Sequence, residues 1–378
     1  MKIALVVNPL DIYSFYDFKD CLNKEEIKKD QEKSNSFNFF DHDNLFLRKL
    51  HLLLHKKKIK INHLKNYDNL DEIDIFYFIG YTKYHSNIIS LIPPKKIKVL
   101  QINEPPAVNA LMHEKKTFDL FDYIFTSNQS IVDNKKFFFI NAHTNISKKN
   151  KRIKAEKFYF SSFIVANRPS YHSTSYHKKK IEIINWFENN RPLDLDLYGV
   201  DWNQYKIVGD GFVSSFLKKI KGGFFLHITN KIINKFYKYS FFKKYFFNEL
   251  KVYKGLVNSK INTISRYKFD FCIENSNYPG FITTRIFHSF LANTVPVYLG
   301  PKDIENFIPR NCFVNLNNFN SVNELHKFLK KMNNEEYNYY LINISNFLDS
   351  KKFKDFCLEY DVNKLYKKFK EFFIVKKF

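Results

Sequence analysis

The stretch from Tyr267 to Pro301 constrains the fold most, because it contains a strand, a polar loop, a helix and a second strand in order. Apolar side chains alternate over 269–273, and a second β-prone run covers 295–299. Between them, Thr283 or Thr284 is able to cap a helix with apolar residues at helical spacing. Two strands joined by a helix form a βαβ unit, which predicts a parallel sheet.

Polar side chains gather where this unit would bind a ligand. In α/β sheets, ligands bind beyond the carboxyl ends of the strands, and a helix N-terminus there favours phosphate oxygens. The candidate residues at this place are Glu274, Asn275, Phe281, Thr283, Thr284 and Arg285. The unit therefore predicts an anion-binding site.

The rest of the chain predicts two α/β domains. Its 378 residues suffice for two domains of ordinary size. The predicted strands before the unit are 3–7, 58–63, 73–79, 98–102, 123–126, 137–140, 160–166 and 193–199, and the predicted helices are 43–55, 178–188, 261–267 and a final helix at 322–331. We expect doubly wound domains over residues 1–155 and 156–350, followed by a basic amphipathic tail at 351–378.

Charge suggests a negatively charged partner. The chain has 61 Lys+Arg against 38 Asp+Glu, a formal net charge of +23. Nucleic acid, a sugar nucleotide and an anionic membrane are candidates, although an AT-rich genome would also enrich lysine. A probable insertion at about 204–250 mixes aromatic and basic residues, which fits a membrane surface, single-stranded nucleic acid or a packed helical hairpin.

The C-terminal tail and the cysteines indicate where in the cell the protein is expected to work. The tail either lies on an anionic membrane or packs back across the domains. No run is apolar enough to cross a bilayer, and the opening residues do not resemble a signal peptide. The four cysteines show no metal-ligand or disulfide spacing, so reduced thiols in a cytoplasm are expected.

The 267–301 block resembles the donor-binding signature of glycosyltransferase family 10, the α-1,3/1,4-fucosyltransferases, in its bacterial type. The family pattern runs F-E-N-S, Y-[IV]-T-E-K and VP[IV]-x-x-G, and the corresponding text here is IENS, FITTR and VPVYLGP. The resemblance implies a GT-B fold, in which two Rossmann-like domains face a cleft. The N-terminal domain would bind the acceptor and the C-terminal domain the nucleotide sugar.

The resemblance also implies a catalytic carboxylate. Glu104 stands in an E-P-P context that matches the family's acidic residue, taken to be the general base for the acceptor hydroxyl. On position alone, a turn residue before two prolines is the simpler interpretation.

Further donor contacts are implied outside the block. Lys179 or Lys180 occupies the place of a diphosphate-binding arginine, and the spacing favours Lys180. Asn167 ends a segment similar to the family's F-V-V-S-N strand end, and Lys254 lies in a Y-x-G segment found in bacterial members. Lysine supplies the charge without arginine's bidentate geometry.

The implied function is inverting transfer of fucose or a related sugar, foremost from GDP-fucose, to a hydroxyl of a glycan or lipid-linked saccharide, with surface polysaccharide or lipopolysaccharide synthesis as the setting. Such a protein would work in the cytoplasm, peripherally on the inner face of the membrane, without nucleic acid as a partner. We expect no required cofactor, with stimulation by a divalent metal left open. The D-x-D at 194–196 is interpreted as part of a strand instead of a metal site.

Two departures leave alternatives open. Family T-E-K becomes Thr283-Thr284-Arg285, so an acid that meets donor hydroxyls is replaced by Thr284. The family tyrosine becomes Phe281, which lacks the hydroxyl. A different nucleotide sugar would fit these changes, since sites built to bind a hydroxyl discriminate strongly. A non-catalytic glycan- or nucleotide-binding module is the other alternative.

Overall fold

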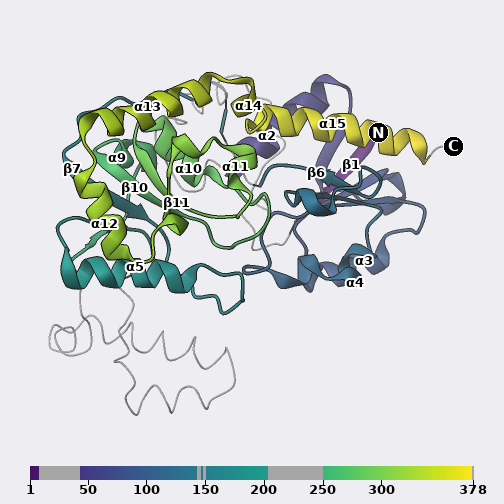
Figure 1. The fold of residues 1–378 in the computed structure, drawn as a ribbon. Coiled ribbons are helices and arrows are strands. Elements are labelled where there is room, and N and C mark those ends of the chain that lie inside the picture. Colours follow the sequence, from purple (N-terminus) through teal and green to yellow (C-terminus); the bar gives the residue numbers. More distant parts are fainter. Residues whose placement is uncertain (8–42, 143–145, 148–149, 203–249, 377–378) are drawn as a thin grey trace, which may run out of the picture.

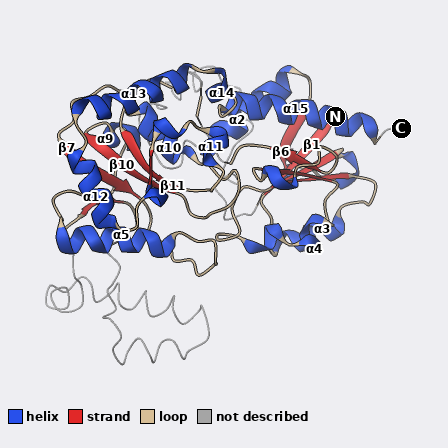
Figure 2. Ribbon diagram, in the orientation of Figure 1, coloured by secondary structure: helices blue, strands red, loops and turns tan. Residues whose placement is uncertain are grey.

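Two parallel sheets of six strands each lie side by side in the computed structural model, with helices covering both (Figures 1 and 2). The structure describes residues 1–7, 43–142, 146–147, 150–202 and 250–376. The predicted insertion at about 204–250 therefore falls almost wholly outside the described residues. Each sheet belongs to one half of the chain, as the sequence predicts for an α/β protein.

The first sheet has the strand order β2-β1-β3-β4-β5-β6, and every pairing is parallel. All five residues of its central strand β3 are buried, because helices cover both faces of the sheet. The strands are β1 (Lys2–Val6), β2 (Lys60–His63), β3 (Ile75–Ile79), β4 (Ile97–Gln101), β5 (Tyr123–Thr126) and β6 (Phe137–Phe139), and the helices α2 (Asp43–Lys56), α3 (Tyr84–Leu91) and α4 (Lys115–Phe118).

The second sheet has the order β12-β11-β10-β7-β8-β9, again parallel throughout. The chain builds outward from β7 on one side and from β10 on the other, so the topological switch point lies between these two strands. The strands are β7 (Tyr159–Ile164), β8 (Asp196–Tyr198), β9 (Tyr253–Gly255), β10 (Tyr267–Ile273), β11 (Val295–Leu299) and β12 (Val314–Asn315). The helices are α5 (His177–Asn190), α9 (Lys260–Ile264), α10 (Thr284–Leu291), α11 (Ile304–Phe307), α12 (Val322–Lys331), α13 (Asn334–Asp349) and α14 (Lys351–Lys354).

The C-terminal tail returns to the first sheet. Helix α15 (Leu358–Val375) runs from the second domain back across the first, where Figure 1 shows it in yellow beside α2. Five of its apolar side chains are buried in the core cluster that contains β1, β3 and α2: Leu358, Val362, Leu365, Phe369 and Phe372. The apolar face of the tail is therefore covered by protein, which matches the second of the two interpretations of this segment.

Replacing Phe369 with Ala should lower the free energy of unfolding by about 3–5 kcal/mol, since a fully buried aromatic side chain would leave a cavity. Phe369 has no exposed surface, and its ring packs edge-on against Tyr77 at 5.1 Å between centroids. Urea denaturation gives the measurement. The matched control is Ile374→Ala on the same helix, where the side chain is 46% exposed and the change should stay within about 0.5 kcal/mol. Equal losses in the two variants would contradict the packing of the tail.

Two helix predictions were wrong. The sequence predicted that the helix at 322–331 is the final one, but α13 follows it. A capping box formed by Asn333 and Glu336 starts α13, and this pattern in the sequence could have predicted the helix. The predicted helix 261–267 ends at Ile264, and Tyr267 already begins β10. Among the described residues, none of the helices combines the length and apolar character needed to cross a bilayer.

Candidate functional site

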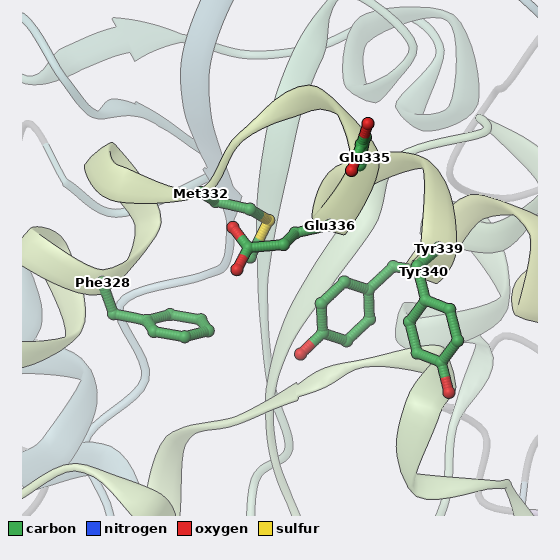
Figure 3. Close-up of a pocket in the computed structure, with 6 residues that line it drawn as sticks. All are labelled: Phe328, Met332, Glu335, Glu336, Tyr339 and Tyr340. Atoms are coloured by element: carbon green, nitrogen blue, oxygen red, sulfur yellow. The ribbon is translucent and has the colours of Figure 1, made fainter.

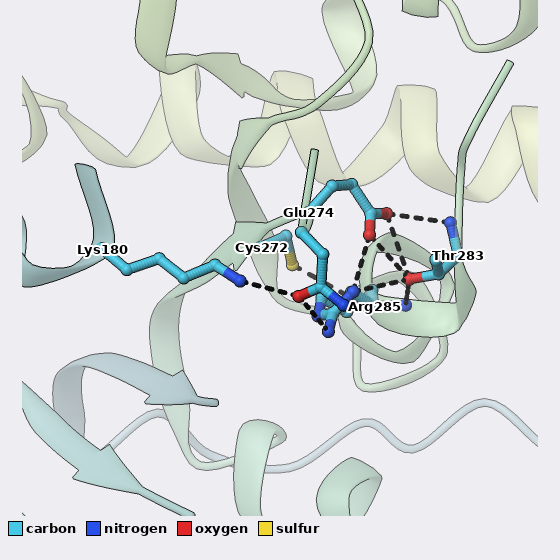
Figure 4. A network of polar contacts seen from close by, with 6 residues as sticks. Lys180, Cys272, Glu274, Thr283 and Arg285 are labelled. Carbon is cyan, nitrogen blue, oxygen red and sulfur yellow. Dashed lines mark hydrogen bonds and ion pairs between the residues drawn. The ribbon is translucent and has the colours of Figure 1, made fainter. Parts of the chain in front are cut away.

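The loop after β10 and the start of α10 form a buried polar network (Figure 4). The carboxylate of Glu274 has no exposed surface and accepts hydrogen bonds from the Thr283 backbone N–H at 2.8 Å and from Arg285 Nη1 at 2.7 Å. Thr283 caps α10, and its hydroxyl also donates to Glu274. The buried carboxylate thereby holds the guanidinium of Arg285 beside a helix N-terminus, as the sequence predicted for the cap.

Lys180 reaches the same network from α5, across the switch point. Its Nζ donates to Asn275 Oδ1 at 2.9 Å, and Arg285 Nη2 donates to the same oxygen at 3.3 Å. Burial and the neighbouring Arg285 lower the pKa of Lys180 to about 7, while Glu274 opposes the shift. Lys179 instead pairs with Glu182 on the surface, so the structure brings Lys180 to the network, as the spacing favoured.

The network rests on a second buried carboxyl group. Asp270 in β10 accepts hydrogen bonds from Ser162 Oγ in β7 at 2.6 Å and from Ser289 Oγ in α10 at 2.7 Å. Burial raises the pKa of Asp270, although these hydroxyl donors partly oppose the shift. Two strands and one helix are thereby linked through one buried carboxyl group, four residues before Glu274 in the chain.

A nucleoside diphosphate should bind this network less tightly as the pH rises above about 7, because the anion favours protonated Lys180. Binding of the anion raises the pKa of this amine above its low value in the free protein. When the pH lies between the pKa values of the free and the bound protein, binding therefore takes up a proton. The affinity should fall up to about tenfold per pH unit from pH ~7 to ~9. Calorimetric titration with GDP at several pH values measures this dependence of the affinity on pH. Lys180→Met should flatten the dependence, and an equally steep profile in that variant would contradict the assignment.

Glu104 follows β4 at the carboxyl edge of the first sheet, and its loop contacts the second domain. Its carbonyl oxygen accepts a hydrogen bond from His113 Nε2 at 2.9 Å. The His113 ring packs edge-on against Tyr278, with 4.9 Å between centroids, and burial lowers the pKa of His113. Burial raises the pKa of Tyr278, while Asn128 and Thr126, at or just after the end of β5, oppose the shift. Loops from both sheets therefore meet beside Glu104.

Gly280 allows the loop after β10 to approach the first domain closely. Its backbone has a φ of +65°, and a Cβ at this position would lie 2.0 Å from the carbonyl oxygen of Ser127. A second contact between the domains is the hydrogen bond from Ser170 Oγ to the Ala107 carbonyl, at 2.6 Å. The carboxyl edges of the two sheets therefore face each other and are in direct contact.

In the described part of the chain, the other predicted site residues form no hydrogen bond with the network. Phe281 is buried in a small cluster with Ala142 and Tyr278, and Thr284 begins α10, half-buried. Asn167 follows β7 and donates through Nδ2 to the Asp201 carbonyl at 3.2 Å. Lys254 is exposed on β9, where its amine donates to the Lys251 carbonyl and lies 3.7 Å from Asp196.

Sequence reasoning missed His113 and Tyr278. Neither belongs to a periodic pattern, and the partners that give them a role come from the other domain, more than a hundred residues away. The one available signal was the position of Tyr278 between the IENS text and Pro279, inside the loop already predicted to bind a ligand.

The D-x-D carboxylates have protein partners. Asp194 accepts hydrogen bonds from His326 at 2.8 Å and Lys330 at 2.7 Å. Asp196 accepts one from the Tyr267 hydroxyl at 2.7 Å. Within the described part of the chain, no group of three or more His, Cys, Asp or Glu side chains is arranged to hold a metal ion.

This arrangement suits stabilisation of a phosphate-bearing leaving group. Two cations and a helix N-terminus converge at the switch point of the second sheet, where α/β proteins bind nucleotides. The carboxylate of Glu104 belongs to the opposite sheet edge, where a second substrate would lie. The same pairing of an anion site with a base would serve any group transfer from a phosphorylated donor to a hydroxyl.

Comparison with known proteins finds a family model that matches the C-terminal part. Residues 229–343 match the model of the glycosyltransferase family 10 (fucosyltransferase) C-terminal domain. The chain is 45% identical over 87 residues to 4-galactosyl-N-acetylglucosaminide 3-alpha-L-fucosyltransferase 9 of Mus musculus, and 35% identical over 82 residues to the human 4-galactosyl-N-acetylglucosaminide 3-alpha-L-fucosyltransferase FUT6. These alignments cover 21% of this chain and 24% and 23% of the relatives, so the chain spans about a quarter of their length.

Solved structures share the fold over nearly the whole chain. An alpha1,3-fucosyltransferase crystal structure superposes with a TM-score of 0.51 at 14% identity, covering 97% of this chain and 88% of that one. T4 phage BGT in complex with its UDP-glucose substrate gives a TM-score of 0.50 at 13% identity, covering 97% and 99% of the two chains. Both likenesses concern the fold, and they confirm the predicted GT-B architecture of two Rossmann-like domains.

Proposed function

We propose, from the membership of residues 229–343 in glycosyltransferase family 10, that this chain is an inverting glycosyltransferase that uses a nucleoside-diphosphate sugar, foremost GDP-fucose. The single observation that carries the proposal is the convergence of Lys180 and Arg285 on one oxygen of Asn275 at the switch point. Glu274 already pairs with Arg285, yet the pKa of Lys180 stays low, so a bound diphosphate would supply the further negative charge that favours protonated Lys180.

In the proposed reaction, the acceptor hydroxyl attacks the anomeric carbon of the donor sugar from the face opposite the diphosphate. The carboxylate of Glu104 takes the hydroxyl proton as the new C–O bond forms. The bond to the diphosphate breaks, and its electron pair leaves with the diphosphate, which Arg285, Lys180 and the α10 N-terminus stabilise. One displacement on one face inverts the anomeric configuration.

A donor panel tests the activity. We expect release of the nucleoside diphosphate from GDP-fucose in the presence of a galactosyl-N-acetylglucosaminide acceptor, since the relatives' names specify that acceptor. GDP-mannose serves as a matched donor that changes only the sugar, and UDP-glucose changes both the base and the sugar. Binding of GDP without turnover of any donor would overturn the enzyme and favour the non-catalytic module.

The second candidate is a transferase of the same fold that uses another sugar. Thr284 carries no charge where the family has an acid, and the Phe281 side chain is buried against Tyr278. The donor sugar would therefore make fewer polar contacts with this chain than the family signature implies. Faster turnover of another GDP- or UDP-sugar in the same panel would favour this candidate.

We also propose that the protein works on surface polysaccharide or lipopolysaccharide at the inner face of the membrane, held there by charge. The apolar face of α15 is buried, while Lys367 and Lys370 of the same helix are exposed to solvent. Charge reversal of Lys367 and Lys370 to Glu should reduce sedimentation with anionic liposomes by about tenfold or more, at roughly 1 kcal/mol per lysine. Salt should weaken the wild-type interaction. Equal binding of both proteins would exclude the tail as the contact.

A further inference from the structure

A groove on the second domain, whose lining shares no residue with the proposed transfer site, is lined by aromatic rings. It lies between α12, the start of α13 and the segment around β12, and two adjoining cavities of about 390 and 610 Å³ share Phe328, Tyr339 and Tyr340. Figure 3 shows the aromatic rings of Phe328, Tyr339 and Tyr340 among the side chains that line the groove. Volumes of this size accommodate ligands of a few sugar rings.

The rings are left open to solvent although they border the core. Phe328 is 41% and Tyr339 56% exposed, while Phe319 packs against Phe328 at 5.2 Å between centroids. Clustered exposed aromatic side chains indicate a binding surface, whereas single ones do not. Flat rings of this kind stack on the apolar C–H faces of pyranose sugars, and tyrosine adds a hydroxyl at the edge.

The polar lining suits a neutral, hydroxyl-rich ligand. The polar residues of the lining include Asn315 and Asn318, together with Arg310 and Glu305. In the described structure, no protein group forms a hydrogen bond or ion pair with the hydroxyls of Tyr339 and Tyr340 or with Arg310. These groups therefore keep their donors and acceptors for a ligand.

The charge of the groove excludes a polyanion. The chain carries +23 overall, yet this lining contains three carboxylates, from Glu305, Glu335 and Glu336, and a single cation, from Arg310. An anionic lipid surface or a nucleic acid would be repelled here while it is attracted elsewhere on the molecule. A neutral saccharide is the kind of ligand that fits the aromatic rings, the amides and the charge of this lining together.

We propose that this groove is a saccharide-binding subsite, distinct from the transfer site, that holds a distant part of a long glycan acceptor. The inference rests on the proposed function only in taking the acceptor to be a glycan. A long glycan bound in the groove and at the transfer site would have a higher local concentration at the transfer site than a short acceptor. Long acceptors would consequently show lower KM values than a disaccharide, with unchanged kcat.

Titration with a neutral oligosaccharide of galactosyl-N-acetylglucosamine repeats, followed by NMR on the full chain, tests the subsite. Tyr339→Ala and Phe328→Ala should each weaken binding at least tenfold, with melting temperatures close to that of the wild type. Tyr171→Ala, at an exposed tyrosine outside the groove, is the matched control and should bind as the wild type does.

The titration is repeated in the Glu104→Gln background, so that failure of catalysis and failure of the subsite are separated. Saturable binding that survives Glu104→Gln and is lost with Tyr339→Ala supports the proposal, even if no donor is turned over. Absence of saturable binding, or binding that Tyr339→Ala and Phe328→Ala both leave unchanged, overturns it. Tighter binding of an oligolysine peptide at the same residues would also overturn it and assign the groove to a basic partner.

Discussion

Replacing Glu104 with Gln should lower kcat by about 10²- to 10⁴-fold, because the amide cannot take the proton of the attacking hydroxyl. The substitution keeps the size and shape of the side chain. The hydrogen bond from His113 goes to the backbone carbonyl of Glu104, so the loop should stay in place. We expect the Kd of GDP and the melting temperature to change little, since the donor network lies on the other domain.

Steady-state kinetics with saturating donor and acceptor measures this effect, and calorimetry with GDP provides the binding control. Glu114→Gln is a matched substitution on the same domain, at a half-buried carboxylate that pairs with Lys116 on the surface. It should leave kcat unchanged. Full activity of Glu104→Gln would remove Glu104 from the role of base.

Replacing Arg285 with Ala should lower the free energy of unfolding by roughly 3 kcal/mol, the lower end of the range for breaking a buried ion pair. Glu274 has no exposed surface, and without Arg285 its charge would keep only the hydrogen bonds from Thr283. The estimate is at the lower end because the Arg285 side chain is 29% exposed and water would partly compensate. GDP affinity should fall as well.

Two controls separate burial from charge in this experiment. Arg152→Ala breaks a surface pair with Asp349, which should cost at most about 1 kcal/mol in urea denaturation. Arg285→Lys keeps the charge and should recover part of the loss, although lysine lacks the second donor that reaches Asn275. If Arg285→Ala lowers the free energy of unfolding no more than Arg152→Ala does, the buried ion pair contributes no net stability. The hydrogen bonds from Thr283 would then suffice to hold Glu274.

Local patterns predicted the parts of the molecule whose structure is local. Strand β5 covers the predicted residues 123–126, and α10 starts at the predicted cap, because alternation and a threonine cap act over a few neighbouring residues. The spacing of the family resemblance favoured Lys180 over Lys179, and the structure brings Lys180 to the network. One face of α5 points to the sheet, and only Lys180 of the two lies on it.

Contacts between distant segments were beyond such reasoning. The packing of α15 on β1 and β3 joins residues about 300 positions apart, and amphipathic character alone fits a membrane as well as a sheet. His113 and Tyr278 likewise gain their roles only through the meeting of two domains. The part of the site within one βαβ unit could be predicted, and the part assembled across the domains could not.

The return of the tail connects the two halves of the chain a second time. The outgoing and returning connections lie against each other: the Leu358 N–H donates to the Ile146 carbonyl at 2.8 Å, and Asn141 donates to the buried carboxylate of Asp361. Because α15 packs against β1 and β3, the first domain contains both the beginning and the end of the described chain, and its core is complete only when this last helix has docked.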